Sequence, residues 1–261
     1  MWIYLTSEGK KDMSSFKEEI SKRRTFAIIS HPDAGKTTLT EKFLLYGGAI
    51  NLAGSVKGKA TARHAVSDWM EIEKERGISV TSSVMQFEYD NYCINILDTP
   101  GYFDFVGEVE EAVSVADAAI IVVNCKAGIE VGTEKAWELC EEYNLPRLFF
   151  VTNMDDDQAS FRELILKLEK QFGRKIAPFQ VPIRENEKFV GFVNAVKMEG
   201  RRFTHLSEYE KCEIPEYTKK NLGIIRDALI EAVAETSEEY MERYFSGEEF
   251  TQEEISGALR A

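Results

Sequence analysis

The feature that most constrains this chain is the segment Ser-His-Pro-Asp-Ala-Gly-Lys-Thr at residues 30–37. An apolar run, residues 26–29, precedes it, and a helical pattern begins directly after it. A strand that turns sharply into a helix leaves several backbone N–H groups unpaired at one point, and the helix N-terminus adds positive potential there. The segment therefore predicts a loop that binds the phosphates of a nucleoside triphosphate.

Individual residues of this loop have predicted tasks. Gly35 lets the backbone approach the ligand, Lys36 reaches the outer phosphates, and the Thr37 hydroxyl is a ligand for Mg²⁺. The first position of such a motif is usually glycine and is Ser30 here, so the match is imperfect, and an ordinary turn with a surface lysine is the alternative. The residues predicted to contact the nucleotide are Ser30, His31, Pro32, Asp33, Ala34, Gly35, Lys36, Thr37 and Thr38.

A second motif, Asp98-Thr99-Pro100-Gly101, follows the alternating segment 92–97 and so lies at the end of a predicted strand. Ligands of open parallel sheets gather beyond the carboxyl ends of the strands, so Asp98 can face the magnesium of the first motif. Gly101 is free to turn its amide toward a γ-phosphate. Alone this motif indicates only a turn, but together with the loop it predicts a nucleotide sensor.

Composition limits the possible partners. The chain has 45 Asp and Glu residues against 32 Lys and Arg, a formal net charge of -13, which argues against broad binding to nucleic acid. Any RNA contact should be local, and the basic clusters at residues 22–24 and 57–63 are candidates, although such clusters are more often solvated faces. We expect a monomer.

Cysteine usage and hydropathy indicate the compartment. The four cysteines have no ligand-like spacing, so we expect reduced thiols in a cytoplasmic protein. No apolar run approaches the roughly 20 residues of a membrane span, and we expect neither an anchor nor a secretion signal.

Alternating apolar strands and amphipathic helices predict an α/β fold of the P-loop NTPase class, with a doubly wound, mostly parallel sheet. The first two strands after the loop are joined by Asp90-Asn91 and should form an antiparallel hairpin at one edge. Strands are predicted at residues 25–30, 79–89, 92–97, 118–124 and 147–152, and helices at residues 38–46, 105–115, 130–143 and 158–172.

Three regions follow from these patterns: a leader and short helix at 1–24, a nucleotide-binding core at 25–175, and a region at 176–261. The last region changes to short strands at 177–181 and 189–193, which predicts a small α+β insert packed beside the core. Two helices are predicted after it, at residues 217–244 and 251–260.

The motifs together carry a family resemblance. Residues 30–37, the sequence Arg-Gly-Ile-Ser at 76–79, residues 98–101 and Asp155 have the order and spacing of translational GTPases. Over roughly residues 14–260 the chain resembles the GTP-binding domain of ribosomal translation factors. Its first half is most similar to peptide chain release factor three, and its second half to elongation factor G and its paralogues.

This resemblance implies a switch that binds GTP or GDP with Mg²⁺ and acts on the ribosome. Ser79 matches the residue that ligates Mg²⁺ only when a γ-phosphate is present, and Gly101 matches the amide that senses the same phosphate. Together with Thr37 and Asp98, Ser79 completes the implied metal site.

Guanine selection departs from the family pattern, in which an Asn-Lys-x-Asp segment contacts the base. The aligned residues here are Thr152, Asn153, Met154 and Asp155. A shift by one residue would restore Asn and Asp but not Lys; we prefer the unshifted alignment because the preceding apolar run fixes the strand end. The resemblance then implies a preference for GTP over ATP with weakened affinity.

Two further departures concern catalysis and the end of the chain. Tyr102 occupies the position of a histidine that orients the attacking water in the family, so Lys36 and Tyr102 are the implied catalytic residues and hydrolysis should be slow. Relatives continue beyond residue 260, so we expect a core that is incomplete at its C-terminus and exposes a sheet edge.

Three functions remain open from the sequence. A slow GTPase domain of a translation factor is the leading hypothesis. A nucleotide-dependent binding module without useful turnover and an inactive fragment are the alternatives, and a P-loop kinase fits least because no acceptor site or lid is recognisable.

Overall fold

The computed structural model describes residues 16–51, 66–67, 70–76, 78–173, 176–186, 188–205 and 208–259. The chain forms two compact units, which meet in sequence between Thr152 and Asn153. The division of the sequence at residue 175 into core and insert stays a prediction. Within the predicted leader, residues 16–21 are helical.

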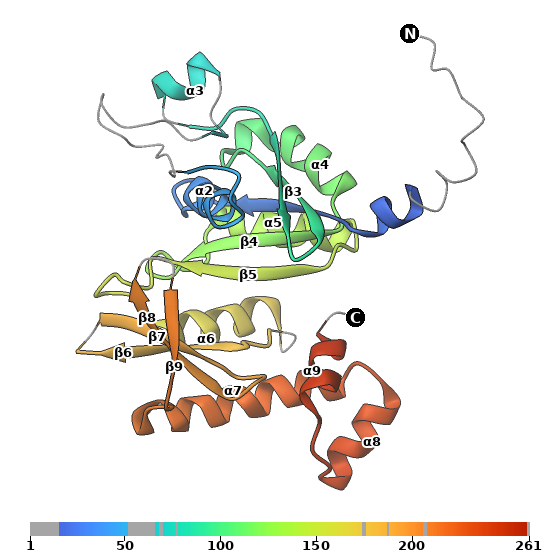
Figure 1. The fold of residues 1–261 in the computed structure, drawn as a ribbon, viewed down its shortest axis with the longest axis vertical. Helices are drawn as coiled ribbons and strands as arrows, with labels where there is room; N and C mark the ends of the chain where they lie inside the picture. Colours follow the sequence, from blue (N-terminus) through green and yellow to red (C-terminus); the bar gives the residue numbers. More distant parts are fainter. Residues whose placement is uncertain are drawn as a thin grey trace. The chain divides into compact units, whose positions relative to one another are not determined.

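The first unit is built on a five-stranded sheet of order β2-β3-β1-β4-β5 (Figure 1). The central strand β1 runs parallel to β3 and β4, β5 runs parallel to β4, and only β2 is antiparallel to its neighbour. The predicted mostly parallel sheet is confirmed. Its strands are β1 (Arg23–Ser30), β2 (Ser83–Tyr89), β3 (Tyr92–Asp98), β4 (Ala118–Asn124) and β5 (Arg147–Thr152).

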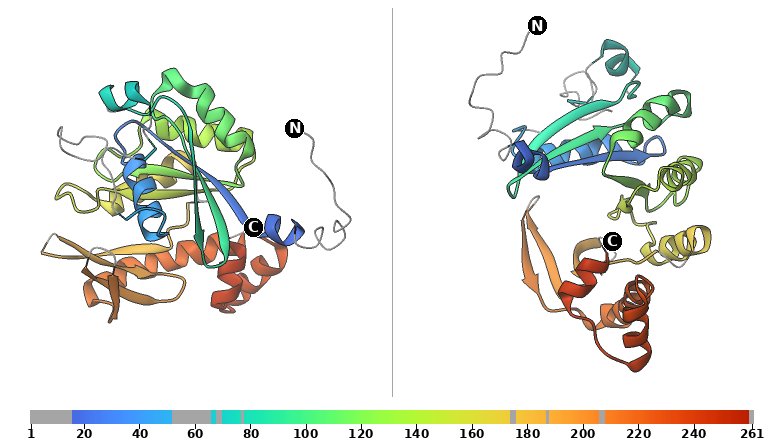
Figure 2. Two further views of the ribbon diagram at one scale, coloured as in Figure 1. Left: turned by 45° about the horizontal axis from the view of Figure 1, so that its top comes forward. Right: turned by 90° about the vertical axis from the view of Figure 1, so that its right-hand side faces the viewer.

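Helices cover both faces of this sheet (Figure 2). Leu39 of α2 packs into an apolar cluster with Ile28, Ile96 and Val122, whereas α4 and α5 lie on the opposite face. Because β1 is buried from Ala27 to Ser30, its carboxyl end is fixed firmly beneath the loop that follows. The helices are α2 (Lys36–Tyr46), α3 (Glu71–Arg76), α4 (Val106–Val115) and α5 (Val131–Glu142), with a 3₁₀ turn η1 (Phe103–Phe105) before α4.

The predicted hairpin is present at the β2 edge of the sheet, and its turn sets the register of β2 with β3. Asp90 and Asn91 have φ angles of 47° and 64°, the left-handed pair that a tight two-residue hairpin requires. The strand before it starts at Ser83 and not at 79, because the amides of Val80 and Thr81 bond to a glutamate side chain and not to β3.

The second unit contains an antiparallel sheet of order β6-β7-β8-β9. The first two strands were expected, but β8 and β9 were not, because their residues are mostly polar and half-buried or exposed. One face of the sheet packs on α7 through Val181, Ile183 and Leu229. Its elements are α6 (Phe161–Phe172), β6 (Gln180–Glu185), β7 (Lys188–Asn194), β8 (Glu199–His205), β9 (Glu208–Cys212) and α7 (Glu216–Ala234).

The helix predicted at residues 217–244 is wrong as a single element. It is divided into α7 and α8 (Glu238–Ser246), because the Ser237 hydroxyl accepts a hydrogen bond from the Tyr240 amide and so starts a new helix. The last helix, α9 (Gln252–Ala258), begins with a reciprocal capping box between Thr251 and Glu254. None of the helices in the described part of the chain is long and apolar enough to cross a membrane.

Candidate functional site

The phosphate loop, residues 30–37, connects β1 to α2 and has the geometry that its sequence predicts. Gly35 has a φ of 97° and Asp33 a φ of 63°, so the chain turns sharply through two left-handed residues. Gly35 is the N-cap residue of α2, and no side chain caps the helix there. The first amides of α2 are therefore available to an anion, the arrangement that favours phosphate.

A buried ion pair joins the two predicted motifs. The Lys36 ammonium lies 2.7 Å from Asp98 Oδ1, and the side chains are only 6% and 1% exposed. The other carboxylate oxygen, Asp98 Oδ2, is buried without a hydrogen-bond partner in the described structure. A buried charged oxygen without a partner is costly, so this atom marks a place where a further group would be stabilised.

Two glycines, one in the loop after β3 and one in the first turn of α5, allow the main chain to pack closely against the phosphate loop. A Cβ atom on Gly101 would lie 3.2 Å from Pro32 Cα, and one on Gly132 would lie 2.6 Å from His31 Cα. His31 Nδ1 accepts a hydrogen bond from the Gly132 amide at 3.3 Å, and its Nε2 lies 3.4 Å from Glu130 Oε1. Of the predicted loop residues, His31 thus ties the loop to the start of α5.

Thr152 is also brought to the loop, in a role that the sequence did not reveal. Its hydroxyl donates to the Ala34 carbonyl at 2.6 Å and lies 3.3 Å from the Val123 carbonyl. Its Cγ2 would be 3.4 Å from a Cβ on Gly35. Thr152 therefore supports the underside of the phosphate loop, a contact that only the position of the β5 end could have indicated.

The other three base-selection candidates begin the second unit. Asn153 has a φ of 53°, which asparagine tolerates better than most residues, and it is exposed like Asp155, whereas Met154 is half-buried. Their contact with a guanine base stays a prediction.

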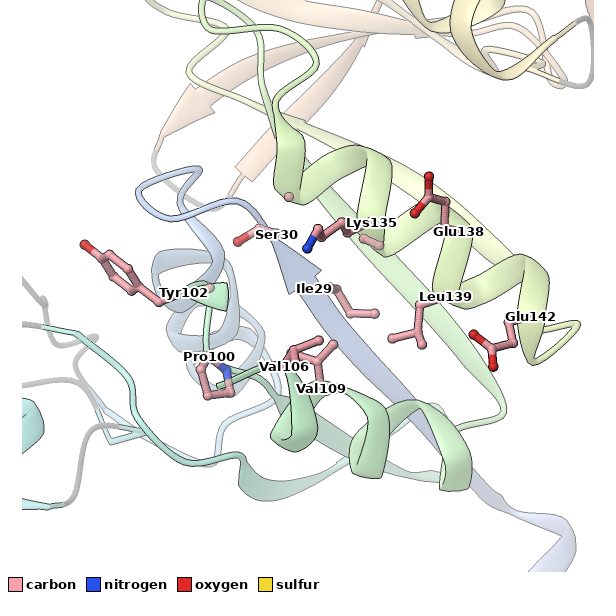
Figure 3. A pocket seen from close by; sticks show the side chains of 13 residues that line it. Ile29, Ser30, Pro100, Tyr102, Val106, Val109, Lys135, Glu138, Leu139 and Glu142 are labelled. Carbon is pink, nitrogen blue, oxygen red and sulfur yellow. The ribbon is translucent and has the colours of Figure 1, made fainter. Parts of the chain in front are cut away.

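Tyr102 follows Gly101 at the rim of a cavity between α4 and α5 (Figure 3). The cavity holds about 220 Å³, and Ile29, Val109 and Leu139 give it an apolar floor. The Tyr102 side chain is 39% exposed and points away from α5. The predicted catalytic phenol thus lies beside Gly101, the predicted γ-phosphate sensor, but is not enclosed.

The predicted metal ligand Ser79 lies in a segment held by carboxylates. We call residues 66–67, 70–76 and 78–83 the switch segment. Glu41 of α2 accepts from the Val66 amide at 2.5 Å, and Glu108 of α4 accepts from the Ser82 amide at 2.7 Å. Glu73 of α3 accepts three amides of the segment. Sequence reasoning missed these three carboxylates, because no local pattern marks them.

The chain matches the model of the elongation factor Tu GTP binding domain over residues 21–249. It belongs to this family. The resemblance to translational GTPases and the predicted P-loop fold are thereby confirmed.

Two peptide chain release factor 3 proteins show how far the family likeness extends. That of Staphylococcus carnosus is 42% identical over 246 residues, 92% of this chain and 45% of the relative. That of Macrococcus caseolyticus is 49% identical over 180 residues, 69% of this chain and 35% of the relative. The matched part of this chain therefore spans between a third and half of the length of these relatives.

A solved structure agrees with the fold of this chain. A crystal structure of a protein from Thermus thermophilus matches with a TM-score of 0.82 and 34% sequence identity, covering 90% of this chain and 34% of that chain. The release factor similarity over 246 residues also reaches well beyond the first half of the sequence.

The residues around Asp98 fit a magnesium ion. Mg²⁺ prefers hard oxygen ligands and is usually held by one or two protein oxygens together with phosphates and waters. Asp98 Oδ2 is a buried carboxylate oxygen without a partner among the described residues, and Thr37 follows Lys36 in the first turn of α2. Thr37 and Ser79 are both half-buried and offer hydroxyls.

Proposed function

We propose that this chain is the GTP-binding domain of a ribosome-associated translation factor, and that it binds GTP with Mg²⁺ and hydrolyses GTP slowly to GDP and phosphate. The observation that carries this proposal is the buried Lys36–Asp98 pair with its unpartnered Oδ2, placed at the uncapped start of α2. Family membership over residues 21–249 supports it.

Each part of the site has a defined task in this function. The amides at the start of α2 bind the phosphate oxygens, and Lys36 exchanges part of its contact with Asp98 for a contact with the outer phosphates. Asp98, Thr37 and Ser79 would hold Mg²⁺, which supplies charge neutralisation between the outer phosphates. The Gly101 amide, packed against Pro32, would report the γ-phosphate.

Slow turnover follows from Tyr102. A phenol can donate and accept one hydrogen bond but is longer than an imidazole and has no second ring nitrogen, so it orients a water less well. Its exposure of 39% also leaves it free to reorient. The same features favour the second candidate, a binding module that switches on nucleotide exchange without useful turnover.

The ribosome is the proposed partner, through local contacts of a monomeric, cytoplasmic chain. Of the basic candidates, Arg24 lies over the Tyr92 ring at 4.6 Å and donates to the Ser21 carbonyl at 2.8 Å. Residues 57–63 lie outside the described part of the chain. All four cysteines are free.

Calorimetry with GTP, GDP and ATP in the presence of Mg²⁺ tests the binding step. We expect micromolar or tighter guanine nucleotide binding and clearly weaker ATP binding; equal ATP and GTP affinity would contradict guanine selection, and no binding would overturn the proposal. Single-turnover phosphate release with and without ribosomes then separates a slow GTPase from a binding module, because only the former releases phosphate.

A further inference from the structure

Glu73 is fully buried, and its carboxylate is satisfied entirely by backbone amides among the contacts that the structure describes. Its exposed fraction is 0%. Oε2 accepts from the Met70 amide at 3.0 Å, and Oε1 accepts from the amides of Val80 and Thr81 at 3.0 and 3.3 Å. Burying a carboxylate is costly unless it is well hydrogen-bonded, so these amides are held where the carboxylate needs them.

The same residue fixes the chain on both sides of Ser79. The Ile78 amide donates to the Glu73 backbone carbonyl at 3.3 Å, and the Val80 amide donates to the Glu73 carboxylate. Ser79 is thus bracketed by two hydrogen bonds to one residue, which restricts its backbone. The Met70 bond alone would be an ordinary helix cap for α3, but the bonds to Val80 and Thr81 join residues beyond the end of α3 and are not explained by a cap.

We propose that Glu73 is a positioning residue that holds Ser79 ready to ligate Mg²⁺ when a γ-phosphate is bound. This inference rests on the proposed GTP-binding function. Ordering a loop residue costs free energy at the moment of binding, and a segment that is ordered beforehand avoids that cost. Since Ser79 is a ligand only in the GTP state, Glu73 should favour GTP over GDP, whereas a merely structural residue would affect both nucleotides equally.

Two substitutions separate the contacts of Glu73 with Val80 and Thr81 from its contact with Met70. Glu73→Ala removes all three amide contacts of the side chain. Glu73→Gln keeps an oxygen for the amides of Val80 and Thr81 but turns an NH₂ group toward the Met70 amide, which is also a donor. The glutamine variant therefore retains the restraint next to Ser79 and loses the one at the start of α3. Glu75→Ala, on the same helix but exposed, is the matched control.

The test compares binding of a non-hydrolysable GTP analogue and of GDP, both with Mg²⁺, by calorimetry. We expect the affinity of Glu73→Ala for the GTP analogue to fall about tenfold, and its affinity for GDP to change less than twofold. Glu73→Gln should lose about threefold for the analogue, and Glu75→Ala should match the wild type. Hydrogen exchange of the nucleotide-free protein should quicken at Val80 and Thr81 in the alanine variant.

Several results would overturn the positioning role. Glu73 would be only structural if Glu73→Ala lowered the affinities for the GTP analogue and for GDP equally. It would also be only structural if the ratio of these affinities and the hydrogen exchange at Val80 and Thr81 stayed at their wild-type values. If Glu73→Ala does not fold, a glutamine variant whose affinities for the GTP analogue and for GDP fall equally leads to the same conclusion. A wild type that binds neither nucleotide would instead overturn the proposed function itself.

Discussion

The phosphate loop and the switch segment belong to the same proposed site but are held by different means. The loop is fixed mostly by the main chain: β1 below it, α2 after it, and the backbone at Gly101 and Gly132 packed against it. The side chains of His31 and Thr152 add one hydrogen bond each. The switch segment is fixed by side chains, because carboxylates from α2, α3 and α4 accept its amides. A loop set by the sheet keeps one shape, whereas a segment set by a few side chains can exchange its contacts, as a switch requires.

The largest expected effect comes from Lys36→Ala, which tests whether the main-chain geometry of the phosphate loop is enough to bind a nucleotide. We expect at least roughly 100-fold weaker binding of GTP and GDP, because the amides alone cannot replace the ammonium. The buried Asp98 would also lose its partner, lowering the free energy of unfolding by about 3–5 kcal/mol. Calorimetry and denaturant unfolding measure the two effects.

A second substitution separates these two consequences. Adding Asp98→Asn to Lys36→Ala should restore part of the lost stability but none of the binding. Recovery of GTP binding in the double variant would show that the amides of α2 act without the ion pair, and the loop would then depend on the main chain alone.

Gly132→Ala tests the packing of α5 on the loop. The new Cβ would meet His31 Cα at 2.6 Å, so His31 must move, and we expect about tenfold weaker binding of both nucleotides and a loss of about 1–3 kcal/mol of stability. Gly107→Ala is the control, since a Cβ there meets nothing within 4 Å and alanine suits a helix better. Wild-type binding by Gly132→Ala would contradict the claim that this backbone contact shapes the loop.

Thr152→Val keeps the shape of the side chain and removes the bond to the Ala34 carbonyl. We expect three- to fivefold weaker binding of GTP and ATP alike, about 1 kcal/mol, because the hydroxyl supports the loop and does not select the base. Competition binding measures the ratio of the two affinities. A change confined to GTP would assign Thr152 to the guanine base and restore the interpretation from the sequence.

The difference between the two regions also explains what the sequence could predict. Lys36, Asp98 and Gly101 were predicted because their tasks depend on local order: a residue type, a spacing and a strand end. The structure brings Lys36 and Asp98 together as expected. The hairpin turn at Asp90 and Asn91 was predictable for the same reason, since two residues alone set its backbone.

The support of the switch segment could not be predicted in this way. Glu73 lies in the charged run Glu-Ile-Glu-Lys-Glu-Arg, where a solvated face is the ordinary interpretation. Only tertiary structure decides that Glu73 is buried while Glu71 and Glu75 are exposed. The strands β8 and β9 were missed for a related reason, because cross-strand pairing and not an apolar pattern defines them.

Glu254, in the second unit, pairs with a cation, whereas Glu73 is bound by backbone amides. The hydrogen bond from Arg243, together with the Thr251 amide, lowers the pKa of Glu254 to about 2. A carboxyl group whose pKa is lower in the folded state stabilises the fold above its unfolded pKa of about 4.3, and this contribution is lost as the pH falls toward 2.

Glu254→Gln should therefore flatten the dependence of stability on pH between about 4.3 and 2, a small effect because the pair is near the surface. Glutamine can still serve the capping box with Thr251, so α9 should persist. Unfolding followed from pH 5 to pH 2 checks this, with the exposed Glu253→Gln as control, and identical slopes in both variants would contradict it. Added salt should reduce the difference in pH dependence caused by Glu254→Gln, because the partner of Glu254 is a cation near the surface that salt screens. The same salt should leave amide exchange at Val80 unchanged, because the buried carboxylate of Glu73 is bound by backbone amides.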